Sequence, residues 1–299
     1  MGARTDQLAR AGPGTSFHAM HWDGRTRTFL LHLPPEAASG APLPLVVVLH
    51  GSGANANTIM DESGLNSRAD SAGYAVVYPN GTGWLRYFVL TWNASGCCGE
   101  ALAHDVDDIG FIGALIRRVT AAMPIDTMRI YATGFSDGAR LVYHLGCDLP
   151  GVFAGIAPVS GGITDTTCHP AHPISVDIFH GTADRLIPYG AGTVPRRRFF
   201  ALRRGRPLER PSSAPETFVF WAQRDSCPSI PSRTVRGTVV TEAYEGCAEG
   251  TEVELHSIRG GRHAWPGGRR GWFLGPEPSR DIDASSEMLQ FFSRHRRQP

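Results

Sequence analysis

One pentapeptide constrains this chain more than any other feature: Gly134-Phe135-Ser136-Asp137-Gly138. The apolar residues before it, over 128–133, are typical of a short buried strand, whereas those after it, over 139–145, have the spacing of a helix. A turn this tight needs both glycines, because a Cβ at either position would collide with neighbouring backbone. We expect the turn to lift the Ser136 hydroxyl above the edge of a sheet.

A strand, a G-x-S-x-G turn and a helix together form the nucleophile elbow of the α/β-hydrolases. A serine hydroxyl is a weak nucleophile, so it needs a general base and a carboxylate that orients this base. In this fold they follow in the order serine, acid, histidine. Asp184 follows an apolar run at 174–179, and His263 lies on a glycine-rich loop after a run at 253–258. The sequence therefore predicts Ser136, His263 and Asp184 as nucleophile, base and orienting carboxylate.

An oxyanion hole is predicted near the start of the chain. A continuous apolar run at 44–49, typical of a central strand buried on both faces, leads directly into His50-Gly51-Ser52-Gly53. Tetrahedral intermediates of acyl transfer are stabilised by N–H donors aimed at the developing charge. We expect these donors to be the backbone N–H groups of Asp137 and Ser52. His50 is expected to hold the loop by a hydrogen bond, not to act as the base.

The alternation of strand-like and helical segments predicts an α/β fold of the α/β-hydrolase type, with a mostly parallel central sheet and helices on both faces. Residues 1–25 are expected to be a flexible N-terminal extension, and residues 26–299 a single catalytic domain. Three prolines, Pro207, Pro211 and Pro215, are expected to keep the segment after the arginine-rich stretch 196–206 irregular. That stretch itself is interpreted as a solvated surface.

Composition excludes several classes of partner. The net charge of +1 gives no reason to expect nucleic acid or an anionic membrane. Apolar runs stay well short of the roughly 20 residues of a membrane helix. The acidic group Asp105, Asp107 and Asp108 lacks the loop of a calcium site and is interpreted as helix capping. We expect no metal and no organic cofactor.

The cysteines bear on both covalent structure and compartment. They number 6 and lack zinc-site spacing: Cys97, Cys98, Cys147, Cys168, Cys227 and Cys247. An even count favours three disulfides if the protein works in an oxidising compartment, although 15 pairings are possible. The N-terminal residues lack a signal-peptide apolar region, so we expect a secreted or periplasmic protein whose signal has been removed. The alternative is a cytoplasmic protein with free buried thiols.

Several motifs, in this order along the chain, resemble one known family. They are His50-Gly51-Ser52-Gly53, Tyr78-Pro79-Asn80-Gly81, Trp92-Asn93 with Gly96-Cys97-Cys98-Gly99, the acidic segment 105–111, the elbow at 131–138, His180-Gly181-Thr182-Ala183-Asp184 and the segment 263–268. The chain resembles, from about residue 27 to 292, the secreted esterases grouped with polyhydroxybutyrate depolymerases and bacterial feruloyl esterases. Relatives often carry Asn after the nucleophile, where this chain has Asp137. The charge of Asp137 beside the oxyanion is expected to tune rate or substrate choice.

The resemblance implies a disulfide pairing. Cys227 and Cys247 recur as a pair in the family, and we expect them to be bonded here. Cys97 and Cys98 would then reach Cys147 and Cys168, in an order that the sequence does not assign.

The resemblance also implies a serine carboxylic-ester hydrolase, with a small-molecule or polymeric ester as its substrate. Trp265, Trp84 and Tyr87 lie in segments that relatives fold near the site, and aromatic walls suit an aromatic acyl group. We therefore expect a feruloyl or cinnamoyl esterase acting on plant cell-wall or related soluble esters. A polyhydroxybutyrate depolymerase is the alternative. A peptidase of the same fold is a rival interpretation, but it would need an added propeller or lid domain. A catalytically inactive binding protein is another, and the intact Ser136, Asp184 and His263 argue against it.

Overall fold

The computed structural model describes residues 8–83, 87–94, 99–149, 151–190, 211–272 and 274–298. Within these residues, ten strands form one sheet. They are β1 (Gly14–Trp22), β2 (Arg25–Leu33), β3 (Leu43–Leu49), β4 (Ala75–Pro79), β5 (Ile125–Phe135), β6 (Gly155–Val159), β7 (Ser175–Gly181), β8 (Ser232–Arg236), β9 (Val239–Tyr244) and β10 (Val253–Ile258). Their order across the sheet is β1-β2-β4-β3-β5-β6-β7-β10-β9-β8.

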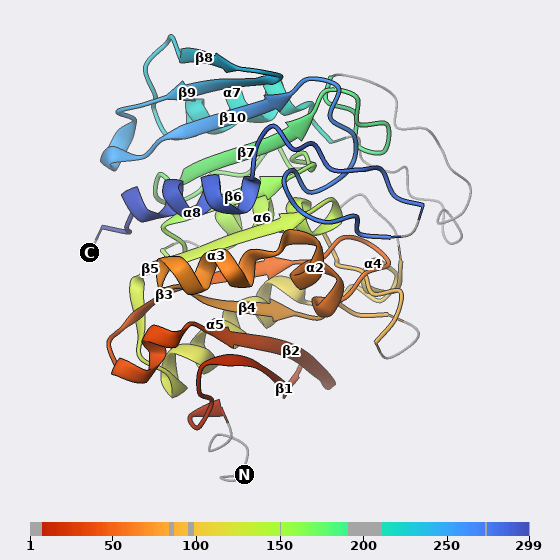
Figure 1. Ribbon diagram of the computed structural model, residues 1–299, viewed down its shortest axis with the longest axis vertical. Helices are drawn as coiled ribbons and strands as arrows, with labels where there is room; N and C mark the ends of the chain where they lie inside the picture. The colour runs from red at the N-terminus through yellow and green to blue at the C-terminus, as the bar shows by residue number, and fades with distance from the viewer. Residues whose placement is uncertain are drawn as a thin grey trace.

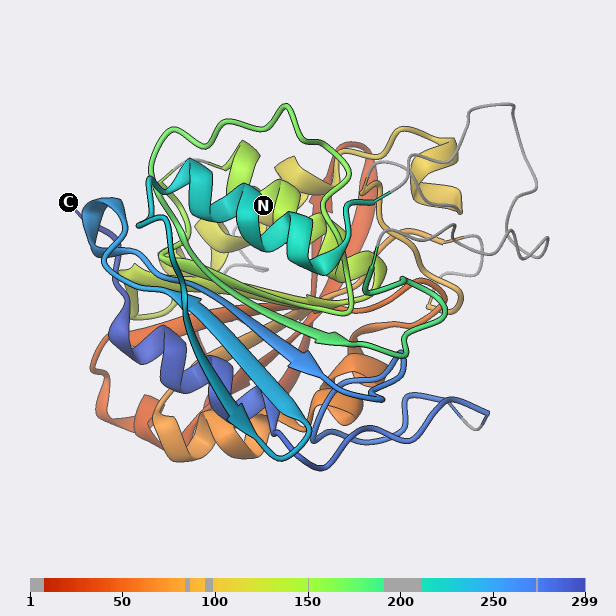
Figure 2. The same ribbon diagram turned by 90° about the horizontal axis from the view of Figure 1, so that it is seen from above.

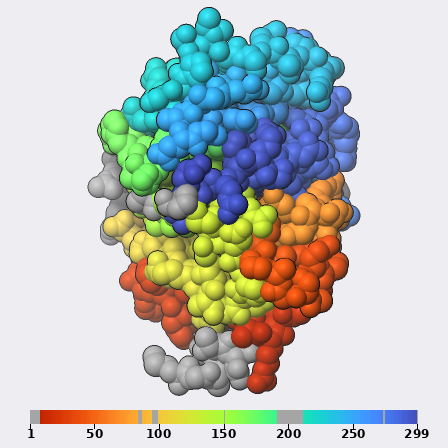
Figure 3. Space-filling model, turned by 90° about the vertical axis from the view of Figure 1, so that its left-hand side faces the viewer, coloured from red at the N-terminus to blue at the C-terminus, as the bar shows by residue number. Residues whose placement is uncertain are grey.

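The centre of the sheet is parallel. Strands β4, β3, β5, β6, β7 and β10 pair in parallel, and Val46 of β3 is in register with Val76 of β4 and Tyr131 of β5. Their carboxyl ends point to the same edge, on the right in Figure 1. Antiparallel strands complete both sides, so the N-terminal strands and the β8–β9 hairpin lie at opposite ends of the molecule (Figure 3).

Helices cover both faces of the sheet (Figure 2). One face carries α2 (Ala56–Ser63), α3 (Leu65–Ala72) and α8 (Ala284–Arg294), and the other carries α5 (Asp108–Ala122), α6 (Asp137–Asp148) and α7 (Ala214–Arg224). Shorter helical segments are η1 (Pro35–Ser39), α4 (Glu100–Ala103) and η2 (Ala248–Gly250). Buried apolar residues divide into two cores, because successive residues of a strand point to opposite faces: Val46 joins one core and Val47 the other. The predicted α/β-hydrolase architecture is confirmed.

The predicted N-terminal extension is wrong for the part that the structure describes. Residues 14–22 form strand β1, which pairs along its full length with β2, and Leu8 is buried in the core. The turn between these strands is Asp23-Gly24, and both residues have positive φ, 46° and 67°. An Asp-Gly pair between two extended runs is a strong hairpin signal, because Asp and Gly tolerate this conformation. That signal was present in the sequence.

The expectation of an irregular segment around Pro215 is also wrong. Helix α7 begins at Ala214, and Pro215 lies in its first turn, where a backbone N–H has no helical partner to lose. The Ser213 side chain accepts a hydrogen bond from the Glu216 amide, and the Glu216 carboxylate accepts one from the Ser213 amide at 2.8 Å. This reciprocal capping fixes the start of the helix despite the prolines.

Two disulfides lie within the described residues. Cys227 is bonded to Cys247, as expected, and Cys147 is bonded to Cys168. The prediction that Cys97 and Cys98 pair with Cys147 and Cys168 is therefore wrong: the last turn of α6 and the loop after β6 lie side by side, with their cysteine Cα atoms 5.8 Å apart. Cys97 and Cys98, like the arginine-rich stretch 196–206, lie outside the described residues.

Candidate active site

The nucleophile elbow has the geometry that its sequence predicts. Ser136 stands between β5 and α6 with φ 57° and ψ −113°, a conformation that L-residues rarely adopt. A Cβ on Gly134 would lie 2.7 Å from the backbone carbon of Gly138, and one on Gly138 would lie 2.6 Å from the carbonyl oxygen of His50. Both glycines are therefore required by close backbone contacts.

The structure brings Ser136, His263 and Asp184 together from three loops at the carboxyl edge of the sheet. Ser136 Oγ lies 2.9 Å from His263 Nε2, and His263 Nδ1 lies 2.7 Å from Asp184 Oδ2. A carboxylate accepts hydrogen bonds, so Nδ1 carries the proton and Nε2 is left to accept from the serine hydroxyl. The other oxygen of Asp184 accepts from the amides of Leu186 and Ile187 at 2.8 and 2.9 Å. These bonds fix the orientation of both the carboxylate and the imidazole.

The acid of this group stays ionised although it is buried. Burial alone would raise the pKa of Asp184, but the hydrogen bond and charge of His263 outweigh it and hold that pKa below its usual range. The neighbouring His180 donates from Nε2 to the carbonyl of Ile187 at 2.8 Å, and burial lowers the pKa of His180. Asp184 can therefore stabilise an imidazolium at His263.

The loop at residues 50–53 packs against the elbow. A Cβ on Gly51 would come within 3.4 Å of the Ser136 Cβ. His50 donates from Nδ1 to the Gly51 carbonyl and accepts at Nε2 from the Gly81 amide, so it is neutral; burial lowers its pKa to about 4. The indole of Trp92 donates to the His50 carbonyl at 2.8 Å. His50 thus holds the loop, as the sequence indicates.

Asp137 makes a contact that sequence reasoning missed. Its side chain is buried, and its Oδ2 accepts from Ser52 Oγ at 2.9 Å and from the Trp92 amide at 3.4 Å. Its Oδ1 has no hydrogen-bond partner among the described residues. Burial raises the pKa of Asp137, and the charge of Arg140 on the same helix opposes this only in part. An acidic residue directly after the nucleophile was the signal in the sequence.

The aromatic residues predicted to bind the substrate differ in their exposure to solvent. Trp265 is fully buried and donates to Ser285 Oγ at 3.0 Å, so its ring has no surface for a substrate and its prediction as a substrate-binding residue is wrong. Trp84 lies outside the described residues. Tyr87 is 40% exposed, and two neighbours that the prediction did not include, Phe88 at 66% and Phe17 at 56%, are exposed too. The ring of Tyr87 meets Phe17 edge-on, with centroids 6.4 Å apart.

A second titratable cluster lies across β7 and β10. His256 Nε2 is 2.9 Å from Asp177 Oδ1 and 3.5 Å from Glu254 Oε2, a set of residue types that can ligate a metal. Burial alone would lower the pKa of His256, but the two carboxylates raise it to about 10. An imidazolium between two carboxylates accounts for this cluster without a metal ion.

The ten-stranded sheet and its nucleophile elbow define an α/β-hydrolase. Residues 27–183 match the family described as "Esterase PHB depolymerase", and the chain belongs to this family. It is 33% identical over 261 residues to the putative esterase NocK of Nocardia uniformis subsp. tsuyamanensis, covering 82% of this chain and 72% of NocK. It is also 33% identical over 190 residues to feruloyl esterase B of Piromyces equi, but that match covers 60% of this chain and only 32% of the fungal enzyme. The prediction of a carboxylic-ester hydrolase is confirmed.

Solved structures agree on the fold. An acetyl xylan esterase from Aspergillus awamori superposes with a TM-score of 0.63 at 15% identity, covering 93% of this chain and 99% of that one. A thermostable esterase superposes with a TM-score of 0.58 at 16% identity, covering 95% of this chain and 63% of that one. At such low identity the likeness concerns architecture alone. Within the described residues, no helix has the length and hydrophobicity needed to cross a membrane.

Proposed function

We propose that this protein hydrolyses carboxylic esters through an acyl-enzyme formed on Ser136. The observation that carries the proposal is the continuous hydrogen-bonded series from Ser136 Oγ through His263 to Asp184, at 2.9 and 2.7 Å. Ser136 Oγ attacks the ester carbonyl carbon while its proton passes to His263 Nε2. The ester C–O bond then breaks, and the departing alcohol takes that proton.

Deacylation repeats these steps with water as the nucleophile. Water attacks the acyl carbon and gives a proton to His263 Nε2, and Ser136 regains a proton as the acid leaves. Asp184, held by the Leu186 and Ile187 amides, stabilises the imidazolium of His263 during both acylation and deacylation. The backbone N–H groups of Asp137 and Ser52 serve as the oxyanion donors. The packing of Gly51 against Ser136 and the Ser52–Asp137 hydrogen bond support this role.

The acyl group that we propose is of the cinnamoyl type. Two exposed aromatic residues, Tyr87 and Phe88, belong to the segment that bonds the oxyanion loop, because the Gly53 amide donates to the Leu90 carbonyl at 2.8 Å. The exposed ring of Phe17 in turn contacts Tyr87. Flat aromatic rings stack on such surfaces. Relatives named feruloyl esterase add support. A polyester such as polyhydroxybutyrate is the second candidate, favoured by the name of the family.

The two substrates are distinguished by kcat/KM for methyl ferulate, a short aliphatic ester and hydroxybutyrate oligomers, with clearing of polymer films alongside. We expect ferulate to be preferred. Tyr87→Leu and Phe88→Leu should each reduce kcat/KM for ferulate by roughly two- to tenfold and leave the aliphatic ester unchanged. Val235→Ala, at an exposed position on β8, is the control. Good cleavage of oligomers and films without ferulate cleavage would establish the depolymerase instead.

A simpler measurement tests the alternative of an inactive binding protein. A fluorophosphonate should label Ser136 in the wild type and give no label in Ser136→Ala.

We also propose that the protein works outside the cytoplasm. Its two described disulfides, Cys147–Cys168 and Cys227–Cys247, persist in oxidising compartments and are rare in the cytosol. Trapping thiols in cells that produce the protein naturally, followed by mass spectrometry, tests this. Reduced cysteines at these four positions would support the cytoplasmic alternative.

A further inference from the structure

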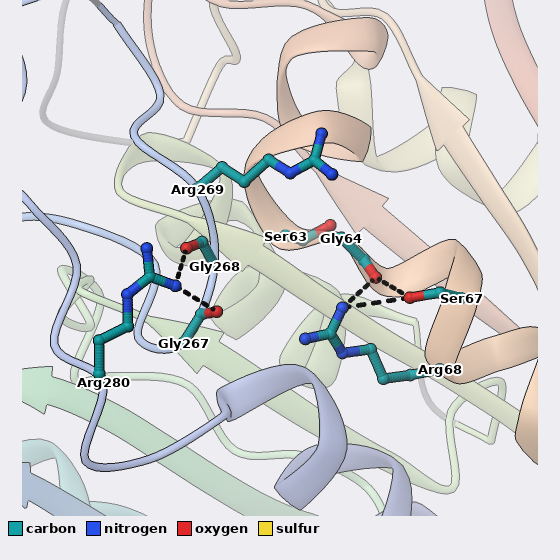
Figure 4. Close-up of a pocket in the computed structure, with 8 residues that line it drawn as sticks. All are labelled: Ser63, Gly64, Ser67, Arg68, Gly267, Gly268, Arg269 and Arg280. Atoms are coloured by element: carbon teal, nitrogen blue, oxygen red, sulfur yellow. Dashed lines mark hydrogen bonds between the residues drawn. The ribbon is translucent and has the colours of Figure 1, made fainter.

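A cavity of about 280 Å³ lies on the face of the sheet that carries α2, α3 and α8, between the joint of α2 and α3 and the loop that follows His263 (Figure 4). Its lining is rich in arginine and otherwise consists of glycine and serine: Ser63, Gly64, Ser67, Arg68, Gly267, Gly268, Arg269 and Arg280. Arg68 and Arg280 extend towards the cavity from opposite walls, and Arg269 extends over its Ser63–Gly64 side (Figure 4). None of these residues belongs to the proposed ester-hydrolysing machinery.

Arg68 has a fixed position. Its Nε and Nη2 donate to Asp283 Oδ2 at 3.1 and 2.7 Å, and its Nη1 donates to the Gly64 carbonyl at 3.0 Å. Asp283 is the N-cap of α8, where its side chain also accepts from the Ser286 amide. The guanidinium of Arg68 is thus held at the cavity before any ligand arrives, which lowers the entropy lost on binding.

The two other arginines keep donors available. Arg280 uses Nη1 for the carbonyls of Gly267 and Gly268, at 3.3 and 3.0 Å, while its Nε and Nη2 have no hydrogen bond with a described residue. The side chain of Arg269 has neither a hydrogen bond nor an ion pair within the described part of the chain, although its amide donates to the Glu62 carbonyl. Both guanidinium groups can therefore turn planar pairs of N–H groups towards a ligand.

The charges around the cavity do not cancel. Three guanidinium groups face it, and among the described residues only Arg68 has a carboxylate partner, Asp283. Glu62 lies behind the wall, but burial raises its pKa to about 8, so its carboxyl is neutral at pH 7. Two positive charges remain beside a small cavity, an arrangement that attracts and concentrates anions.

We propose that this cavity binds the oxyanion group, a phosphate or a carboxylate, of a small anionic molecule. Arg269 and Arg280 bind the oxyanion through paired N–H groups, and Arg68, whose charge is paired with Asp283, forms a fixed opposite wall. The volume suits a ligand no larger than a phosphorylated or acidic monosaccharide. This binding function is separate from ester hydrolysis, and its test does not depend on whether the protein hydrolyses esters.

The ligand would join two walls that already share hydrogen bonds, one of them from the Arg269 amide to the Glu62 carbonyl. The Trp265 indole donates to Ser285 Oγ at 3.0 Å, and Ser285 Oγ donates to the Ser63 carbonyl at 2.9 Å. An anion held between Arg280 and Arg68 would add a link between the His263 loop and α3. A ligand that binds the folded state and not the unfolded chain should raise Tm, and Tm should go on rising with the logarithm of ligand concentration above Kd.

The experiment is calorimetric titration of the full chain at low ionic strength, with inorganic phosphate in one arm and D-glucuronate in the other. We expect saturable binding of at least one probe, weakened tenfold or more in Arg269→Gln with Arg280→Gln. Arg269→Gln alone removes no hydrogen bond to a described residue, so it should fold and still bind several-fold more weakly. Arg233→Gln, an exposed arginine on β8, is the matched control and should bind like the wild type.

The two arms identify the source of the oxyanion. Binding of phosphate alone assigns a phosphorylated ligand, and binding of glucuronate alone assigns an acidic sugar or related carboxylate. Absence of saturable binding of either probe at concentrations up to about 50 mM would overturn the proposal. Equal affinities in the wild type and in the folded Arg269→Gln variant would overturn it as well.

Discussion

Ser52 and Asp137 are joined by a hydrogen bond from Ser52 Oγ to Asp137 Oδ2 at 2.9 Å. These are the two residues whose backbone N–H groups we propose as oxyanion donors. One buried carboxyl group therefore links the loop after β3 to the first residue of α6. Its ionised form would also place a negative charge beside the developing oxyanion, so its protonation state bears on the barrier.

Asp137→Asn should change the pH profile of turnover. Burial raises the pKa of Asp137, with Arg140 opposing this and Asp108, itself paired with Arg27, reinforcing it. The wild-type carboxyl is thus neutral at low pH and charged above its raised pKa. We expect wild-type kcat to fall roughly tenfold as pH rises through that pKa, and the neutral Asn variant to lack this fall. The measurement is kcat from pH 5 to 9, with an ester whose leaving group does not titrate.

Ser52→Ala is the partner experiment. It removes the hydroxyl that donates to Asp137 but keeps the backbone N–H, so kcat should fall while KM changes little. Identical pH profiles for the wild type and Asp137→Asn would contradict an electrostatic role for Asp137.

Ser136→Ala should abolish ester cleavage, and Asp184→Asn should reduce kcat by about 10⁴-fold. The amide of Asn would favour the wrong tautomer of His263, whereas the alanine lacks the nucleophile. Circular dichroism should show both variants folded. Near-normal turnover in either variant would refute the assignment of the three roles.

Loss of the Cys227–Cys247 disulfide should destabilise the fold. Its cysteines are 20 residues apart in the sequence, and closing a loop of that length stabilises by about 3 kcal/mol in the chain-entropy model. Cys227→Ser with Cys247→Ser should lower Tm by roughly 5–10 °C. Activity should fall too, because the bond lies just before β10, which leads to His263. Reducing agent should lower Tm less in this variant than in the wild type, and an equal effect on both would count against the prediction.

Asp225 should make stability decrease with rising pH. It caps the end of α7, where it accepts from the Ile174 amide at 3.2 Å, and burial raises its pKa to about 7. An unfolded Asp titrates near 3.9, so the folded state holds the proton more tightly. The stability contribution is therefore fully present below about pH 4 and is lost as pH rises towards 7.

Asp225→Asn removes this titration and keeps the acceptor for Ile174. We expect the variant to exceed the wild type in free energy of unfolding by on the order of 2 kcal/mol at pH 8, with a smaller difference at pH 4. Urea unfolding at both pH values measures it. A gain that is the same at both values would show that charge is not the cause.

Much of the candidate site was predictable because it follows strands. Ser136, Asp184 and His263 each come directly after a strong apolar run, and the carboxyl ends of parallel strands meet at one edge of a sheet. The role of His50 in holding its loop followed from the same logic. The hydrogen bond between Ser52 and Asp137 was not predictable, because it depends on how the loop after β3 packs against the nucleophile elbow.

The errors share a cause. Trp265 is close to His263 in the sequence, but its ring is buried in the core. Nearness in the sequence does not tell which way a side chain points. The pairing of Cys147 with Cys168 depends on the packing of α6 against the loop after β6, which no spacing rule encodes. The strand β1 and the helix α7, in contrast, had local signals, Asp23-Gly24 and the Ser213–Glu216 capping pair, that outweigh the glycines and prolines around them.

The positive φ of Ser136 has a consequence for evolution and engineering. A non-glycine residue held at φ 57° and ψ −113° costs about 1–3 kcal/mol, which the surrounding packing must offset. Glycine would relieve the strain but would leave no hydroxyl, so Ser136→Gly should be more stable than the equally inactive Ser136→Ala by roughly 1 kcal/mol. Selection for thermal stability therefore favours glycine at this position, whereas selection for activity requires serine.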